Sequence, residues 1–141
     1  MAQSLSTVAL GEPELIERSL IDGLLQYNEA LLGRAGRSTL AVSARLPDGA
    51  IAGGATGRVI YECLMVELVW LAEEHRGNGL GSRILAAMEV EAKRRGATKA
   101  YLDTFDFQAA PFYGKHGYVE AARVVGFFNG RDRIYMTKMP L

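Results

Sequence analysis

A glycine-rich stretch contains the residues best suited to bind an anion. From Glu73 to Leu85 the sequence is EEHRGNGLGSRIL, with Gly77, Gly79 and Gly81 in its middle. Glycine weakens both helices and strands, so this cluster needs a reason. At the start of a helix, unpaired amides and the helix dipole attract negative charge, and glycines let a phosphate come close. The stretch therefore predicts a phosphate-binding turn, unless it merely joins a strand to a helix.

Two nucleotide-binding patterns do not fit this turn. The dinucleotide pattern G-x-G-x-x-G fails at its third glycine, where the chain has Ser82 or Ile84, depending on the starting glycine. The P-loop pattern fails because the chain lacks the lysine that must precede its serine or threonine. The pattern that remains is Arg76-x-x-Gly79-x-Gly81.

Strand and helix patterns alternate along the elements that must position the turn. Pro13–Gly33 and Leu80–Gly96 carry apolar residues at helical spacing, and a short helix is expected at 109–118. Strands are expected at 6–11, 38–46, 50–62, 63–71 and 99–107, and a hairpin at 119–139 that turns at Asn129-Gly130. This order predicts one α/β (α+β) domain over residues 1–141. Its mixed, mostly antiparallel sheet has about six to seven strands and one parallel crossover, from 63–71 to 99–107.

Composition and charge argue against several kinds of partner. Sixteen basic and sixteen acidic residues cancel, so we expect neither a nucleic acid nor a membrane as partner. Cys63 is the single cysteine and favours a buried apolar role, and the two histidines lack partners at metal-binding spacing, so no metal is expected. The first residues lack the pattern of a signal peptide, and no apolar run is long enough to span a membrane, which predicts a cytoplasmic protein.

Two blocks of the sequence resemble the GNAT superfamily of acyl-CoA-dependent N-acetyltransferases. The first is the Arg-x-x-Gly-x-Gly turn after an apolar strand. The second is AAPFYGKHGY, where the positions of the family pattern are filled by Ala109 or Ala110, Phe112, Tyr113, Gly117 and Tyr118. The order of elements is similar over nearly the whole chain. The resemblance implies a GNAT-like fold whose parallel β-α-β crossover holds the cofactor loop, with acetyl-CoA as cosubstrate.

The resemblance also implies a set of cofactor-binding positions. The diphosphate of coenzyme A would lie against the turn residues Arg76, Gly77, Asn78, Gly79, Gly81 and Ser82. Arg76 would add either its side-chain charge or only main-chain contacts. The pantetheine arm would lie along main-chain groups of the preceding strand, at Trp70, Leu71 and Ala72, in the way that a peptide adds to a sheet edge.

Catalytic positions follow from the second block and from one acidic strand residue. Tyr113 matches the family tyrosine that protonates the departing thiolate, although a core aromatic with a surface hydroxyl is the alternative. Glu67 lies among apolar residues in the strand 63–71 and is the candidate general base. It is equally well explained as the partner of an arginine or as a solvent-facing residue. Asp103 is the second candidate for the base.

Asp106 departs from the family pattern, in which many members have an asparagine seven residues before the tyrosine. An aspartate lacks the amide donor that holds the cofactor arm, and it repels a polyanion. Either the arm is held by another residue, such as Gln108, or Asp106 points away. Pro111 is tolerable only in the first turn of its helix, which should therefore start near Ala109 or Ala110.

The predicted function is transfer of an acetyl group from acetyl-CoA to a primary amine, with Tyr113 as the acid. A small-molecule amine is the default acceptor because the chain is neutral, with a protein amine behind it. The alternative is a non-catalytic acyl-CoA-binding or sensing module on the same fold. By analogy with the family, we also expect a homodimer.

Overall fold

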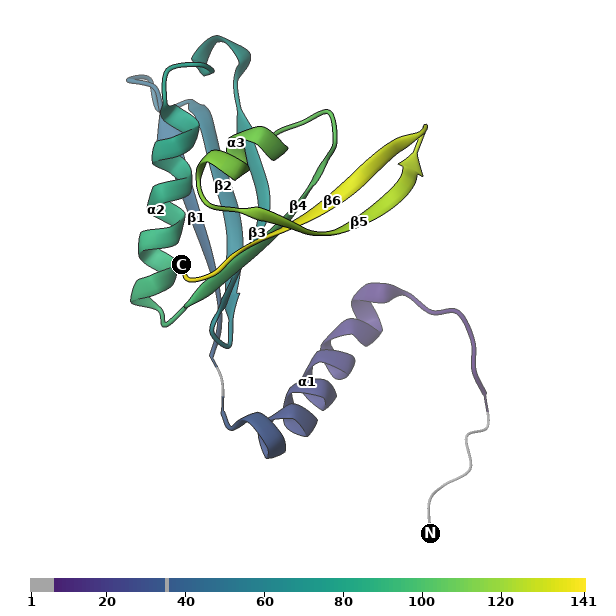
Figure 1. Ribbon diagram of the computed structural model, residues 1–141. Helices are drawn as coiled ribbons and strands as arrows, with labels where there is room; N and C mark the ends of the chain where they lie inside the picture. The colour runs from purple at the N-terminus through teal and green to yellow at the C-terminus, as the bar shows by residue number, and fades with distance from the viewer. Residues whose placement is uncertain (1–6, 35) are drawn as a thin grey trace. The chain divides into compact units, whose positions relative to one another are not determined.

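The computed structural model describes residues 7–34 and 36–141, and the contacts divide the chain into two units. The first contains the helix α1, and the second runs from Gly36 to Leu141 (Figure 1). This division leaves the single domain over residues 1–141 a prediction.

Helix α1 spans Pro13–Leu32 and begins and ends where the sequence predicts. Pro13 occupies its first turn, and the Gly33 N–H closes the last turn by donating to the Glu29 carbonyl at 3.0 Å. The prediction of a strand before this helix, at 6–11, was wrong for residues 7–11, which form no regular element. Residue 6 lies outside the described residues. Val8 and Leu10 are almost fully exposed in this segment. Its composition favours a strand, but the segment pairs with no strand of the described residues.

The second unit is built on a six-stranded sheet in the order β1-β2-β3-β4-β6-β5. The strands are β1 Arg37–Arg45, β2 Ile51–Ile60, β3 Cys63–Leu71, β4 Lys99–Phe105, β5 Val119–Phe128 and β6 Arg131–Lys138. Every neighbouring pair is antiparallel except β3 and β4, which are parallel and are joined through α2. The predicted fold class, with its single parallel crossover, is therefore confirmed.

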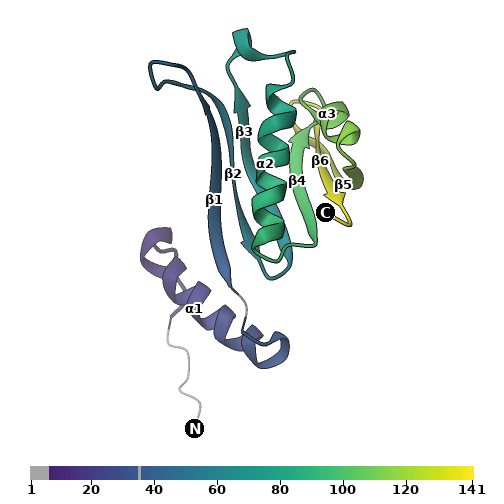
Figure 2. The ribbon, with the colours of Figure 1, turned by 90° about the vertical axis from the view of Figure 1, so that its left-hand side faces the viewer.

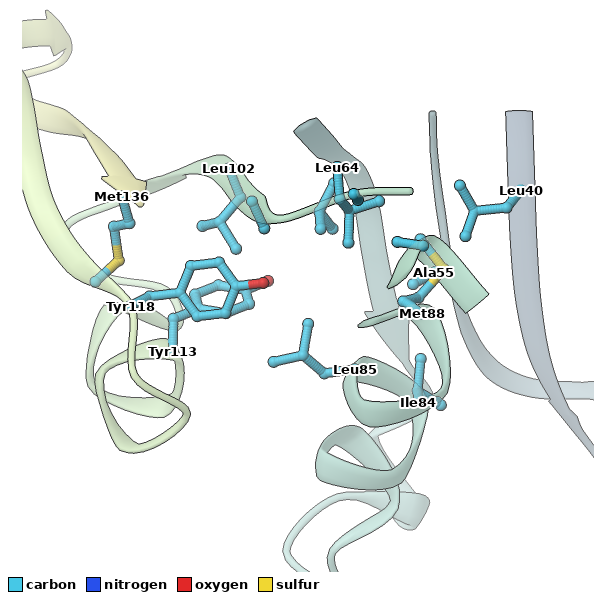
Figure 3. Packing of buried hydrophobic residues seen from close by; sticks show 14 of the residues in the cluster. Leu40, Ala55, Leu64, Ile84, Leu85, Met88, Leu102, Tyr113, Tyr118 and Met136 are labelled. Carbon is cyan, nitrogen blue, oxygen red and sulfur yellow. The ribbon is translucent and has the colours of Figure 1, made fainter. Parts of the chain in front are cut away.

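Helices α2 (Leu80–Arg94) and α3 (Ala110–Lys115) contribute to a core on one face of this sheet (Figure 2). Ile84, Leu85 and Met88 of α2 meet apolar side chains of the sheet, among them Leu64 and Leu102 (Figure 3). Leu64 and Met88 are 0% exposed, so the predicted apolar stripe of α2 is the buried face of this helix. As expected from Pro111, α3 starts at Ala110.

Cys63 opens β3 at the position where the strand pairs with Lys99 of β4. Its thiol is half-buried, and burial raises its pKa, an effect that the charge of Lys99 partly offsets. The residue packs as a small apolar side chain. Among the described helices, none is long and apolar enough to cross a membrane.

Candidate functional site

The parallel strands β3 and β4 separate soon after they begin. They pair with each other at three positions, the last joining Met65 to Tyr101, and beyond it these two described strands form no further pair with each other. Two cavities lie beyond this point, with volumes of about 660 Å³ and about 250 Å³. The separation creates space on the side of β3 that an adjacent strand would otherwise occupy.

The larger cavity brings the predicted strand and turn residues together. Its lining includes Trp70, Leu71, Arg76, Gly77, Gly79, Gly81 and Ser82. Of the predicted cofactor positions, only Ala72 and Asn78 do not line it. The lining also includes positions with no predicted cofactor role, which are Val69, Phe107, Ala109 and Phe112.

Main-chain groups of β3 provide polar atoms along one wall of the larger cavity. The Ala72 N–H already donates to the Ala52 carbonyl of β2 at 2.9 Å. Because main-chain groups alternate in direction along a strand, those of Leu71 and Val69 face away from β2. Val69 was not predicted as a cofactor position. The register of β3 on β2 decides which main-chain groups face the cavity, and the Val69 side chain does not indicate this register.

The turn before α2, which follows a short 3-10 helix (η1, Glu73–His75), exposes unpaired amides to the same cavity. Gly77 and Gly79 have φ values of +76° and +85°, a conformation that favours glycine. The Leu80 N–H is capped by the side chain of Asn78 at 3.2 Å. Within the described chain, no acceptor takes the amides of Gly81 and Ser82. These two amides, at the positive end of the helix dipole, can bind an anion.

Arg76 contributes to the turn by bracing it. Its Nε and Nη2 atoms donate to the Leu71 carbonyl oxygen at 3.0 and 2.9 Å. The side chain therefore holds the end of β3 to the turn. Its positive charge still lies on the wall of the larger cavity.

Helix α3 is anchored on the first turn of α2 through two contacts. A Cβ atom on Gly81 would lie 3.4 Å from the Phe112 ring, an ordinary van der Waals distance, so the two helices lie close together at this point. The Ser82 hydroxyl lies 2.9 Å from Nε2 of His116, the residue that ends α3. The turn before α2 and α3 are thus parts of one packed arrangement.

Tyr113 of α3 lines both cavities. Its ring packs against Phe112 and Tyr118, at centroid distances of 5.2 and 5.9 Å, and it is 6% exposed. Figure 3 shows the Tyr113 ring beside that of Tyr118. No group in the described residues hydrogen-bonds its hydroxyl. Burial raises the pKa of Tyr113 above its ordinary value of 10.0, so the hydroxyl keeps its proton at neutral pH.

The smaller cavity contains both carboxylates that the sequence suggests as bases. Glu67 lies at an irregularity in the pairing of β2 with β3, and its Oε1 atom pairs with Arg58. Asp103 of β4 pairs through Oδ1 with Arg133 of β6. The side chains of Glu67 and Asp103 are 26% and 28% exposed. In the described structure each carboxylate keeps its second oxygen outside any hydrogen bond, so either can accept a proton.

Asp106 and Gln108 are the two residues that concern the departure from the family pattern, and they lie in different surroundings. Asp106 turns toward the β5–β6 hairpin, where Oδ2 accepts the Asp132 N–H at 3.1 Å and Oδ1 lies 3.0 Å from Arg131 Nε. It lines neither cavity. Gln108 lines both, and its Oε1 accepts the Phe105 N–H at 2.9 Å. Because a main-chain donor fixes which atom is the oxygen, the Gln108 amide N–H groups remain for a ligand.

No cluster of three metal-ligating side chains occurs among the described residues. The two cavities present main-chain amides, the Tyr113 hydroxyl and two ion-paired carboxylates. These groups suit the binding of an anion and the movement of a proton.

Comparison with known proteins identifies the relatives of this chain. Residues 10–118 match the model of the acetyltransferase (GNAT) family. An acetyltransferase of Agrobacterium fabrum is 31% identical, over 95% of this chain and 96% of the relative. The blasticidin-S acetyltransferase of Streptomyces morookaense is 42% identical over 54% of this chain and 57% of its own. The crystal structure of an acetyltransferase from Bacillus cereus superposes with a TM-score of 0.86 at 28% identity, covering 95% and 97% of the two chains.

Proposed function

The chain belongs to the acetyltransferase (GNAT) family, and on that premise we propose that it acetylates a primary amine of a small molecule with acetyl-CoA. The observation that carries this proposal is the position of Tyr113 on the wall shared by the two cavities. A group placed there can act on an acetyl thioester that enters from the larger cavity while an amine enters from the smaller one.

Acetyl-CoA is the acetyl donor of GNAT acetyltransferases, and the larger cavity has groups for each part of it. The unpaired amides of Gly81 and Ser82 would bind the diphosphate. The outward-facing main-chain groups of Val69 and the N–H of Leu71, whose carbonyl is occupied by Arg76, would pair with the pantetheine arm along the open side of β3. Gln108 would donate its amide hydrogens to the arm, the role that Asp106 cannot perform.

In the proposed reaction, the neutral amine attacks the carbonyl carbon of the thioester. The new C–N bond forms, the carbonyl oxygen takes the negative charge, and a carboxylate accepts the ammonium proton. The intermediate then collapses, the C–S bond breaks, and the sulfur leaves with the proton that the Tyr113 hydroxyl donates. The raised pKa of Tyr113 keeps this proton available, and a thiolate is a tolerable leaving group.

We keep Glu67 as the general base, with Asp103 as the alternative. Both lie in the smaller cavity with Tyr113, and both are paired with an arginine on one oxygen only. Glu67 is on β3, the strand along which the thioester would lie. Its free oxygen is therefore the better placed of the two for a proton that leaves the attacking amine.

The acceptor is proposed to be small because the cavity available to it holds about 250 Å³. The blasticidin-S acetyltransferase, a relative over about half of this chain, is named for a small-molecule antibiotic. A cavity of this volume has room for the primary amine at the end of a larger polar molecule of that kind.

Two measurements test the proposal. Thermal shift with acetyl-CoA, coenzyme A, NAD and ATP should show stabilisation by the first two only. A panel of amines, including aminated antibiotics, polyamines and lysine peptides, should then give coenzyme A release with at least one small amine. Stabilisation by coenzyme A without turnover of any amine would favour the non-catalytic binding module. Light scattering after size-exclusion chromatography tests the homodimer.

A further inference from the structure

We propose that His116 is a positioning residue for coenzyme A, which holds the Ser82 hydroxyl so that its proton points at the diphosphate. The inference rests on the proposed function, because it requires the diphosphate to lie at the first turn of α2. It assigns a role to a side chain that lines neither cavity and touches the ligand only through Ser82.

The contact between the two side chains joins the turn to α3. Ser82 is the third residue of α2 and lines the larger cavity, and its Oγ lies 2.9 Å from His116 Nε2. The His116 ring is held in turn against the Phe112 ring, with their centroids 4.9 Å apart. Both members of the contact are half-buried, so the imidazole has a defined orientation behind the hydroxyl.

The proton count of this contact decides what it does when the diphosphate is present. A serine hydroxyl has one proton to donate, and diphosphate oxygens at neutral pH accept hydrogen bonds only. If Ser82 donates to the diphosphate, its contact with His116 requires a hydrogen on Nε2. An Nε2 without hydrogen would instead accept the hydrogen bond of the Ser82 hydroxyl, and the oxygen lone pairs would then face the anion. His116 therefore has to carry hydrogen on Nε2 in the complex.

Few other side chains of the larger cavity can supply this interaction. Its lining contains no lysine or histidine, and its one arginine, Arg76, already donates two hydrogen bonds to Leu71. Ser82 is the only hydroxyl of the turn itself, next to the unpaired amides. A hydrogen bond to a charged group contributes more than one between neutral groups, so the direction of this hydroxyl matters for affinity.

The test compares coenzyme A with pantetheine, which lacks the diphosphate, by calorimetry on the full chain. We expect Ser82→Ala and His116→Leu each to weaken coenzyme A binding by about tenfold, with pantetheine binding unchanged. His116→Gln, whose amide can donate to Ser82, should restore coenzyme A affinity. His116→Leu added to Ser82→Ala should weaken binding no further, because His116 acts through the hydroxyl.

Several results would overturn the inference. They are unchanged coenzyme A affinity in His116→Leu, equal losses for coenzyme A and pantetheine, no recovery in His116→Gln, and additive losses in the double variant. Nitrogen-15 NMR of the wild-type imidazole needs no variant and should show hydrogen on Nε2 when coenzyme A is bound. A bare Nε2 in the complex would contradict the inference. A wild-type chain that does not bind coenzyme A would overturn the proposed function too, whereas the other outcomes leave that function standing.

Discussion

The larger and the smaller cavity share Tyr113 but are built from different parts of the chain. The larger one is formed by main-chain amides, two glycines with positive φ and the open side of β3. The smaller one has two carboxylates, each held by an arginine from a neighbouring strand. The difference indicates that the first cavity depends on backbone shape and the second on particular charged side chains.

This comparison predicts how each cavity responds to substitution. A backbone-built site should tolerate a changed side chain on its wall, apart from the Ser82 hydroxyl, but not an added carbon atom where glycine leaves space. A site built from charges should lose its chemistry when one carboxylate becomes an amide, even though the shape is kept. Tyr113, which belongs to both, should affect turnover without affecting cofactor affinity.

The largest effect is expected from Tyr113→Phe, which removes only the hydroxyl. Turnover should fall by about 100-fold, the lower range for loss of a general acid, because the thiolate leaves without its proton. Coenzyme A affinity should stay at the wild-type value because the ring still packs against Phe112 and Tyr118. Steady-state kinetics and calorimetry measure the two quantities. Tyr101→Phe is the matched control, since Tyr101 lines neither cavity, and equal turnover in the two variants would refute the role of Tyr113.

Glu67→Gln should have the next largest effect and lower turnover by more than about tenfold, because the amine proton loses its acceptor. Cofactor affinity should not change, since Glu67 lines only the smaller cavity. Asp103→Asn is the matched control, because Asp103 has the same kind of ion pair in the same cavity. Kinetics across pH distinguish the two variants. A larger loss in Asp103→Asn would transfer the role of base to Asp103.

Gly79→Ala tests the backbone-built cavity and should weaken coenzyme A binding by about tenfold. The added carbon would meet no protein atom within 4 Å, so it would occupy space next to the unpaired amides. Gly49→Ala is the control, because Gly49 has a similar φ of +89° and open surroundings in the turn between β1 and β2. Both substitutions should cost about 1–2 kcal/mol of unfolding free energy. Calorimetry should find weaker binding in Gly79→Ala alone, and a loss of equal size in both would attribute it to strain.

The smallest effect is expected from Trp70→Phe. The Trp70 side chain lines the larger cavity but is 56% exposed, and the main-chain groups next to it are the proposed contacts. Coenzyme A affinity should therefore change by less than about 0.5 kcal/mol, as for an ordinary surface substitution. Calorimetry decides this directly. A loss above about tenfold would mean that the indole itself clamps the cofactor, and the contrast between the two cavities would fail.

The sequence predicts the parts of the site that depend on local chain geometry. The glycines at 77, 79 and 81 predict a turn before α2, Pro111 restricts where α3 begins, and apolar spacing defines the buried face of α2. These features arise from residues within a few positions of one another, so motif and periodicity are enough to find them. The positions that the family resemblance implies for the cofactor also lie within one short stretch, and the larger cavity contains most of them.

The ion pairs of the smaller cavity could not be predicted in this way, because they depend on how the strands pair in the sheet. Arg133 joins Asp103 from β6, and nothing near either residue indicates this pairing. The irregularity of β3 at Glu67 likewise depends on its register with β2. Val8 and Leu10 show the opposite error, in which a local β-like pattern does not form a strand without a partner.

The half-buried thiol of Cys63 has a practical consequence for measuring this enzyme. It is the only cysteine of the chain, and its burial both raises its pKa and limits the access of a reagent to its sulfur. Aromatic disulfide reagents that detect released coenzyme A should therefore react with the product much faster than with the protein. The fold itself gives such a colorimetric assay a low background.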